Sequence, residues 1–219
     1  IDIPIGRDVA PGVYRGTVHI RGKAFQGAGS SRKVSSSIDF TVRVYPVILP
    51  EQSLLVTNWY FPERFHWMNG GKPVKEGSRK YWDCMKAVVS MAAAHGQNVW
   101  LLKPRGRAYV KSDGSTGFDF SEMDKHIEFL LANADVRCIE ADHIGKRSNN
   151  GWTDPFLTSV PIEAYFSALQ EHLKSRHLPD GRTWLDIWLQ HIADEPIPEN
   201  LKSWESLATR VKKAAPEMK

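Results

Sequence analysis

The sequence predicts an α/β protein, namely the first half of a (β/α)8 TIM-like barrel preceded by the end of a β-sandwich domain. Three observations support this fold class. Strands with alternating side chains precede residue 50, strands and helices alternate after it, and no nucleotide-binding glycine motif follows any predicted strand. With 219 residues, 42% of them hydrophobic, the chain is long enough to bury one sizeable core. We therefore predict two regions, residues 1–50 and residues 51–219.

The first region has the pattern of an antiparallel β domain. Apolar and polar residues alternate over residues 13–20 and 38–45, which predicts two half-buried strands. Residues 22–37 between them are rich in glycine and serine, which predicts a long hairpin loop. A sandwich needs about seven strands, so we interpret residues 1–50 as the C-terminal part of such a domain. Pro46 and Pro50 mark the exit, because proline cannot donate to a continuing strand ladder.

The second region alternates between strand and helix patterns. The predicted strands are residues 54–60, 98–102, 138–141 and 184–192, and the predicted helices are residues 79–95, 121–132, 162–176 and 199–214. Ser121 is the expected N-cap of the second helix, and Gly96 the expected glycine after the first. Four βα units fit either an open doubly wound sheet or half of an eight-stranded barrel. Because the glycine-rich loop of nucleotide-binding sheets is missing, we favour the barrel.

Composition narrows the classes of partner. The net charge is +4, but lysines and arginines are interleaved with acids, which indicates an ordinary solvated surface and no nucleic-acid partner. No apolar stretch approaches the roughly 18 residues of a membrane span. Cys84 and Cys138 are expected to be buried free thiols, since no Cys-x-x-Cys pair is present. The eight tryptophans suit either core packing or stacking on sugars.

Polar and aromatic residues follow all four predicted strands. In order along the chain they are Asn58, Trp59 and Tyr60, then Lys103 and Arg105, then Glu140, Asp142 and His143, then His191, Asp194 and Glu195. The carboxyl ends of barrel strands meet at one face, where the active sites of these folds lie. We therefore expect a concave site that combines acids, imidazoles and an aromatic surface.

The adjacent acids Asp194 and Glu195 are the candidate catalytic pair. Neighbouring residues of a regular strand point to opposite faces, so the pair must lie beyond the end of the fourth strand. Pro196 supports this placement and favours an extended conformation for Glu195. Two carboxyl groups held close together raise the pKa of one of them, which is how glycosidases keep a general acid protonated. The alternative is that these acids simply begin a helix.

Other candidates also have structural alternatives. His191 suits a hydrogen-bonded core histidine as well as a substrate ligand, and residues 58–60 suit core packing at the barrel mouth. The insertion at residues 61–80 is either a lid or sugar platform, through Phe65, His66 and Trp67, or a variable surface loop. The acids and histidines at the strand ends could form a metal site, but no metal-binding spacing is present, so we predict no metal and no cofactor.

The order of these features resembles the catalytic domain of glycoside hydrolase family 123 and its relatives of unknown function. The similar segments are residues 10–18, residues 44–50, the strand end Asn58-Trp59-Tyr60, and Ala193-Asp194-Glu195-Pro196. The resemblance covers most of the chain but stops after four βα units. It therefore implies a truncated barrel that a further chain segment or an oligomer would complete, and the activity of these residues alone depends on that completion.

The resemblance also implies a function. The family looks like retaining exo-β-N-acetylhexosaminidases, specifically N-acetylgalactosaminidases, which use the acetamido oxygen of the substrate as nucleophile. Asp194 would orient the acetamido group, and Glu195 would protonate the departing oxygen and later activate water. The expected substrate-binding residues are His191, Trp59, Tyr60, Asn58, Asp142 and His143. The implied substrate is a glycan or glycoconjugate, and the implied location is secreted or periplasmic.

Two other functions remain open from the sequence. One is a carbohydrate-binding relative whose acids no longer catalyse. The other is a metal-dependent barrel hydrolase.

Overall fold

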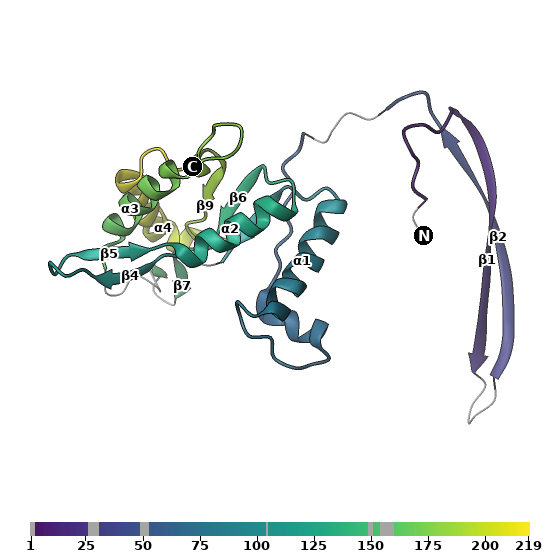
Figure 1. The fold of residues 1–219 in the computed structure, drawn as a ribbon, viewed down its shortest axis with the longest axis horizontal. Helices are drawn as coiled ribbons and strands as arrows, with labels where there is room; N and C mark the ends of the chain where they lie inside the picture. Colours follow the sequence, from purple (N-terminus) through teal and green to yellow (C-terminus); the bar gives the residue numbers. More distant parts are fainter. Residues whose placement is uncertain (1–2, 26–30, 49–52, 104, 149–150, 154–159) are drawn as a thin grey trace. The chain divides into compact units, whose positions relative to one another are not determined.

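The computed structural model describes residues 3–25, 31–48, 53–103, 105–148, 151–153 and 160–219. The chain divides into two compact units, Ile1–Gln52 and Ser53–Lys219, so that the division lies two residues beyond the predicted boundary. Figure 1 shows a mixed α/β chain whose sheets are small and unclosed. Within the described residues, no helix has both the length and the apolar character that crossing a membrane requires.

The first unit is a long antiparallel hairpin of β1 (Gly12–Phe25) and β2 (Ser31–Val44) (Figure 1). The two predicted strands are confirmed, but they extend well beyond their predicted ends. The predicted loop at residues 22–37 is wrong in its described part, because pairing continues to the Phe25–Ser31 pair. Continued pairing satisfies the backbone N–H and C=O groups, and this outweighs the weak strand preference of glycine and serine. A two-stranded sheet by itself encloses no sandwich core.

The second unit is built on a three-stranded parallel sheet. Its order is β3 (Val99–Leu102), β6 (Cys138–Ala141) and β9 (Trp188–Gln190). The predicted second and third strands are confirmed. The parallel strands lie side by side in the order in which they occur along the chain, so no reversal of strand order is present among them.

The predicted first strand, residues 54–60, is reduced to a single parallel bridge between Thr57 and Val99. The cause lies in Asn98, whose side-chain amide replaces ladder hydrogen bonds. Its Oδ1 accepts the Val56 N–H at 2.9 Å, and its Nδ2 donates to the Leu54 carbonyl at 2.9 Å. The segment therefore runs beside β3 without forming a regular strand.

The predicted fourth strand, residues 184–192, is also corrected. Its first half is the 3-10 turn η2 (Trp184–Ile187), and only β9 follows as strand. The Asp186 carboxylate accepts both the backbone N–H and the hydroxyl of Thr183, at 2.7 and 2.8 Å. This reciprocal cap starts a helical turn, although the apolar run in the sequence suits a strand.

The four predicted helices are confirmed, with shifted ends. They are α1 (Arg79–Ala94), α2 (Ser121–Asn133), α3 (Ile162–Ser175) and α4 (Leu201–Ala214). Ser121 is the first residue of α2 and not its N-cap, because the Asp119 carboxylate accepts the Ser121 N–H at 2.9 Å. Gly96, which follows the C-cap of α1, has φ +87°, a conformation that glycine adopts readily.

Several short elements were not predicted. They are the hairpin of β4 (Arg107–Val110) and β5 (Thr116–Asp119), the hairpin of β7 (Lys146–Ser148) and β8 (Gly151–Thr153), and the 3-10 turns η1 (Pro62–Asn69) and η3 (Pro198–Asn200). These elements connect or follow the βα units. They leave the order of the parallel sheet unchanged.

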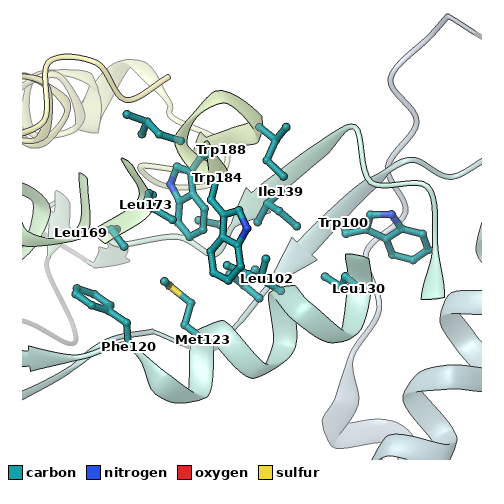
Figure 2. Close-up of a cluster of buried hydrophobic side chains, with 14 of the residues drawn as sticks. Trp100, Leu102, Phe120, Met123, Leu130, Ile139, Leu169, Leu173, Trp184 and Trp188 are labelled. Atoms are coloured by element: carbon teal, nitrogen blue, oxygen red, sulfur yellow. The ribbon is translucent and has the colours of Figure 1, made fainter. Parts of the chain in front are cut away.

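The hydrophobic core lies on one face of the parallel sheet. Figure 2 shows Trp100, Leu102 and Ile139 from the strands with Met123 and Leu130 of α2. Residues of α1, α3 and α4 belong to the same cluster. Because side chains alternate along a strand, the intervening strand residues face the other way. That second face carries the buried residues Val99, Leu101, Cys138 and Glu140. Glu140 on this face belongs to the candidate site.

Candidate functional site

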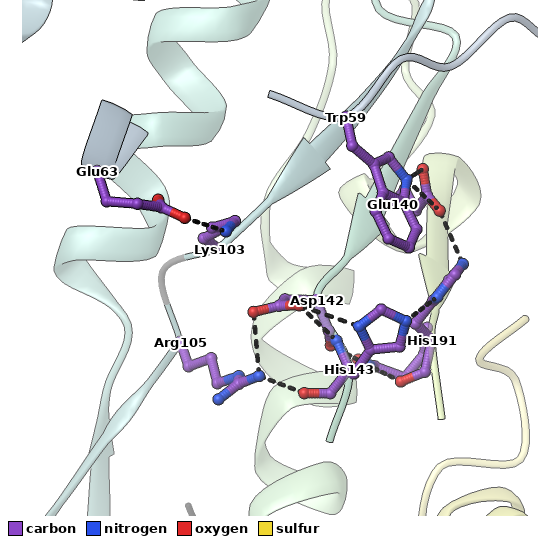
Figure 3. A network of polar contacts seen from close by, with 9 residues as sticks. Trp59, Glu63, Lys103, Arg105, Glu140, Asp142, His143 and His191 are labelled. Carbon is purple, nitrogen blue, oxygen red and sulfur yellow. Dashed lines mark hydrogen bonds and ion pairs between the residues drawn. The ribbon is translucent and has the colours of Figure 1, made fainter. Parts of the chain in front are cut away.

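The candidate site centres on Glu140, a carboxylate inside β6 with only 6% of its surface exposed. Among the described residues, three side chains contact it, and Figure 3 shows two of them, Trp59 and His191. The hydroxyl of Thr57 donates at 2.8 Å and the indole N–H of Trp59 at 3.2 Å. The Nε2 atom of His191 lies 2.7 Å from a carboxylate oxygen. Glu140 thereby joins the segment beside β3 to the residue that follows β9.

The contacts continue from His191 to Arg105. His191 Nδ1 lies 2.9 Å from His143 Nε2, and His143 Nδ1 lies 3.3 Å from Asp142 Oδ1. Asp142 Oδ2 in turn accepts from Arg105 at 3.2 Å, and Arg105 also donates to the His143 carbonyl oxygen. We call the series Glu140, His191, His143 and Asp142 the strand-end chain. It links two carboxylates through two imidazoles (Figure 3).

Trp59 forms the aromatic wall of this site. The rings of His143 and His191 pack edge-on against the indole, with ring centres 5.4 and 5.8 Å away. The indole N–H is held by Glu140, while 37% of the Trp59 surface stays exposed. An aromatic ring that is fixed on one side and exposed on the other can stack on the C–H face of a sugar.

The structure separates the predicted binding residues into two groups. Trp59, Asp142, His143 and His191 come together at the strand-end chain. Asn58 is exposed and contributes its carbonyl oxygen to Gln97, and the Tyr60 hydroxyl donates to the Leu101 carbonyl. Alternation of side chains along an extended segment accounts for this division, because Thr57 and Trp59 share the side that faces Glu140.

Tyr60 lines a separate cavity of about 460 Å³. Tyr81, Lys103, Glu63 and His126 also line it. Lys103 is paired with Glu63 at 3.4 Å, so this predicted strand-end residue lies in the cavity and not in the strand-end chain. Burial, with a smaller contribution from Tyr81, raises the pKa of the Tyr60 phenol well above its usual value. The phenol therefore stays protonated over the physiological pH range.

The insertion at residues 61–80 is partly anchored. Phe65 lies in the hydrophobic core, where its ring centre is 5.6 Å from that of Tyr81. His66 contacts the Glu63 carbonyl through Nδ1 at 3.0 Å. Trp67, by contrast, is 68% exposed and has the Arg64 guanidinium over its ring at 5.4 Å. The base of the insertion is therefore fixed by the core while the Trp67 indole is exposed, and its role as a lid, a sugar platform or a surface loop stays a prediction.

The predicted acid pair lies just beyond the sheet. The carbonyl of Ile192 still accepts the N–H groups of Ile144 and Gly145, at 3.2 and 2.8 Å, and the chain then leaves the strand contacts. Asp194 and Glu195 follow, and both are exposed. The expected extended conformation of Glu195 is wrong, because its φ is +45°. A non-glycine residue rarely occupies this left-handed region, and such strain is concentrated at functional sites.

Glu140 is the residue that sequence reasoning undervalued. The sequence places Glu140 among the polar residues expected at the strand ends and as a candidate metal ligand, whereas the structure places it inside β6. Its signal is a single acid within the otherwise apolar strand Cys138–Ala141, since a charged residue is almost never fully buried without partners. Thr57 had no comparable signal. Among the described residues, no three histidines, cysteines or acids form a group able to hold a metal ion.

Comparison with known proteins does not assign the chain to a family. The chain matches no protein-family model and no curated protein sequence. The resemblance to glycoside hydrolase family 123 therefore stays a prediction from the quoted segments. The function must be inferred from the geometry of the strand ends.

Proposed function

We propose that this chain contains the catalytic residues of a retaining exo-β-N-acetylhexosaminidase that removes terminal N-acetylgalactosamine from a glycan or glycoconjugate. The observation that supports this proposal best is the convergence of acids, imidazoles and Trp59 at the carboxyl ends of parallel strands. Glycosidases need a pair of carboxyl groups and a surface that binds the sugar ring. In this chain the acid pair follows β9, and Trp59 follows the segment that is bridged to β3 at Thr57.

The proposal includes the finer fold, namely the first four βα units of a (β/α)8 barrel. Doubly wound sheets reverse their strand order at the ligand-binding crevice, whereas β3, β6 and β9 are in sequential order. Right-handed crossovers in sequential order place the helices on one face, in agreement with the single-faced core. The segment around Thr57 would supply the first barrel strand. The hairpin of the first unit would be the end of a β-sandwich domain.

In the proposed reaction the acetamido oxygen of the substrate attacks the anomeric carbon. Asp194 accepts the acetamido N–H and thereby stabilises the positive charge of the forming oxazoline ring. Glu195 donates its proton to the departing glycosidic oxygen, then removes a proton from the water that opens the ring. Two displacements at the same carbon retain the configuration. Exposure of both carboxyl groups leaves them accessible to substrate.

The rest of the strand ends would bind the terminal sugar. Trp59 would stack on the sugar C–H surface, and His191 beside it would limit the depth of the site. The proposal requires that a sugar stacked on Trp59 place its anomeric carbon within reach of Asp194 and Glu195.

Hydrolysis of aryl N-acetyl-β-galactosaminides and β-glucosaminides by the 219-residue chain and by longer versions of the protein would test this proposal. Glu195→Gln should lower turnover on substrates with poor leaving groups by about 100- to 10,000-fold. Glu199→Gln, which changes another exposed carboxylate on η3, serves as the matched control and should leave turnover unchanged. An unaltered rate in Glu195→Gln would exclude Glu195 as the general acid.

The second candidate is a carbohydrate-binding protein that does not catalyse. The exposure of Asp194 and Glu195 favours it, because glycosidases usually keep their general acid protonated in a shielded setting. Titration calorimetry with N-acetylgalactosamine separates the candidates. Binding without hydrolysis of any aryl glycoside would support the second candidate and contradict the first.

A further inference from the structure

The cavity of about 460 Å³ at the carboxyl end of β3 is lined by none of the residues to which the proposed function assigns a role. Its volume is within the range of small-molecule sites, about 300–1,000 Å³. Lys103, which follows β3, lines it together with Tyr81 of α1 and His126 of α2. Tyr81 and His126 are buried, whereas Glu63 and Glu76 are exposed. The cavity therefore has an aromatic inner end and an acidic mouth.

Hydrogen bonds at the inner end determine what Tyr81 can offer to a ligand. His126 Nδ1 lies 2.8 Å from the carbonyl oxygen of Glu122, which can only accept, so the hydrogen of the neutral ring is on Nδ1. The other ring nitrogen, Nε2, is then an acceptor. It takes the hydroxyl hydrogen of Tyr81 across 3.0 Å. The Tyr81 oxygen is left with acceptor capacity only.

The second phenol of the lining is committed in the same way. Tyr60 donates its hydroxyl hydrogen to the Leu101 carbonyl oxygen at 3.2 Å, so neither phenol has a hydrogen left for a ligand. Among the described side chains of the lining, Lys103 alone retains further N–H groups, and its ammonium is held by Glu63 at 3.4 Å. The lining is therefore rich in hydrogen-bond acceptors.

The charges of the lining favour a ligand of the same kind. Lys103 pairs with Glu63 and also lies over the Phe61 ring at 4.6 Å, which leaves the carboxylate of Glu76. No basic side chain of the described residues forms an ion pair with Glu76. Burial first, and then the charges of Glu76 and Glu63, raise the pKa of the Tyr81 phenol, so both carboxylates act on the inner end. Two carboxylates and one ammonium leave one negative charge in excess.

We propose that this cavity binds a small organic cation that carries a primary ammonium group. The ammonium group supplies both the N–H donors and the positive charge that the acceptor-rich lining requires. The phenol rings and Val74 offer apolar surface to the alkyl part, and the faces of aromatic rings also attract cations. The inference goes beyond the proposed function and does not depend on it.

Titration calorimetry of the wild-type chain with three probes of equal chain length tests this ligand class. Hexylamine, a primary ammonium at neutral pH, should bind. Hexanol has the same alkyl chain without the charge, and hexyltrimethylammonium has the charge without N–H donors, so each should bind about tenfold more weakly. Equal affinity for either of these two probes, or no binding of hexylamine, would overturn the proposal. This comparison needs no variant.

Two variants locate the bound probe. Glu76→Gln removes the unpaired charge and should weaken hexylamine about fivefold, while Val74→Trp should abolish binding by filling the cavity. Both residues lie in the loop between η1 and α1, outside the helices and strands, so both variants are expected to fold. Glu205→Gln, which changes an exposed carboxylate of α4, is the matched control and should bind as the wild type does. Wild-type affinity in Glu76→Gln or in Val74→Trp would contradict the assignment to this cavity.

The same titrations separate this inference from the proposed function. Glu195→Gln, which removes the proposed general acid, should bind hexylamine with unchanged affinity. Selective binding of hexylamine by a protein that hydrolyses no aryl glycoside would support the cation site and contradict the proposed function. Hydrolysis by a protein that does not bind hexylamine would do the reverse.

Discussion

Two acidic regions belong to neighbouring strands of one sheet, one inside β6 and the other beyond the end of β9, and their surroundings differ sharply. Glu140 is buried and accepts hydrogen bonds from Thr57 and Trp59. Asp194 and Glu195 are exposed beyond β9, where the backbone of Glu195 is strained. The contrast separates a carboxylate that is built into the fold from two carboxylates that stay accessible, as the proposed function requires of groups that meet a substrate. The predictions below test this division.

The largest expected effect on stability is that of Glu140→Ala. Removing the buried carboxylate leaves His191, Thr57 and Trp59 without their acceptor, so the free energy of unfolding should fall by about 3 kcal/mol. Asp194→Ala is the comparison and should change it by no more than about 0.5 kcal/mol. Urea unfolding followed by tryptophan fluorescence measures both. Equal losses would remove the structural distinction between the two regions.

Asp194→Asn should show the opposite profile, with folding intact and activity impaired. Since the proposed role of Asp194 is to hold the acetamido group, hydrolysis of N-acetylated substrates should fall about 100-fold. Substrates without an N-acetyl group provide the internal control and should be affected far less. A loss of the same size on both substrate types would argue against catalysis assisted by the acetamido group.

A smaller effect is expected for Thr57→Val, which deletes one hydrogen bond to Glu140. A hydrogen bond to a charged, buried acceptor contributes about 1.5 kcal/mol, so the free energy of unfolding should fall by that amount. Thr17→Val is a matched control, because the Thr17 hydroxyl donates at 2.7 Å to Asp39 on the exposed hairpin. Chemical denaturation should detect little change in that variant. A Thr57→Val protein as stable as the wild type would show that Glu140 does not need this donor.

The smallest effect concerns pH and Cys138, which lies two residues before Glu140 on the same face of β6. Burial first, and the charge of Glu140 second, raise the pKa of the Cys138 thiol from 9.0 to about 11. The unfolded thiol ionises first as the pH rises. The Cys138 thiol therefore makes its full contribution to the free energy of unfolding below pH 9, and this contribution is lost as the pH rises from about 9 to 11. At pH 10 the loss should be about 1 kcal/mol.

The difference in urea midpoint between the wild type and Cys138→Ala, followed from pH 8 to pH 10, isolates the contribution of the Cys138 thiol. In the Glu140→Gln background the decline should be weaker, because one of the two causes of the raised pKa is removed. An identical decline in both backgrounds would contradict a charged Glu140.

The sequence by itself determined most of the local structure of the second unit. The apolar periodicity and glycine signals predicted all four helices, and the short apolar runs predicted β3 and β6. Local patterns also predicted that acids, histidines and Trp59 follow the strands. These features depend on residues close together in the chain, so the sequence contains the information directly. The predictions of the first and fourth strands were inaccurate because the side chains of Asn98 and Asp186 bind backbone groups that a strand ladder would otherwise pair.

Only the tertiary structure decided which of those residues meet. The contact of Glu140 with Trp59 spans 81 positions and that of His143 with His191 spans 48, distances at which no local pattern indicates a partner. The direction of a side chain depends on the parity of its strand and on the register of its neighbours, which pairing sets. This is why Asn58 and Tyr60 separated from Trp59, although the three are adjacent in sequence.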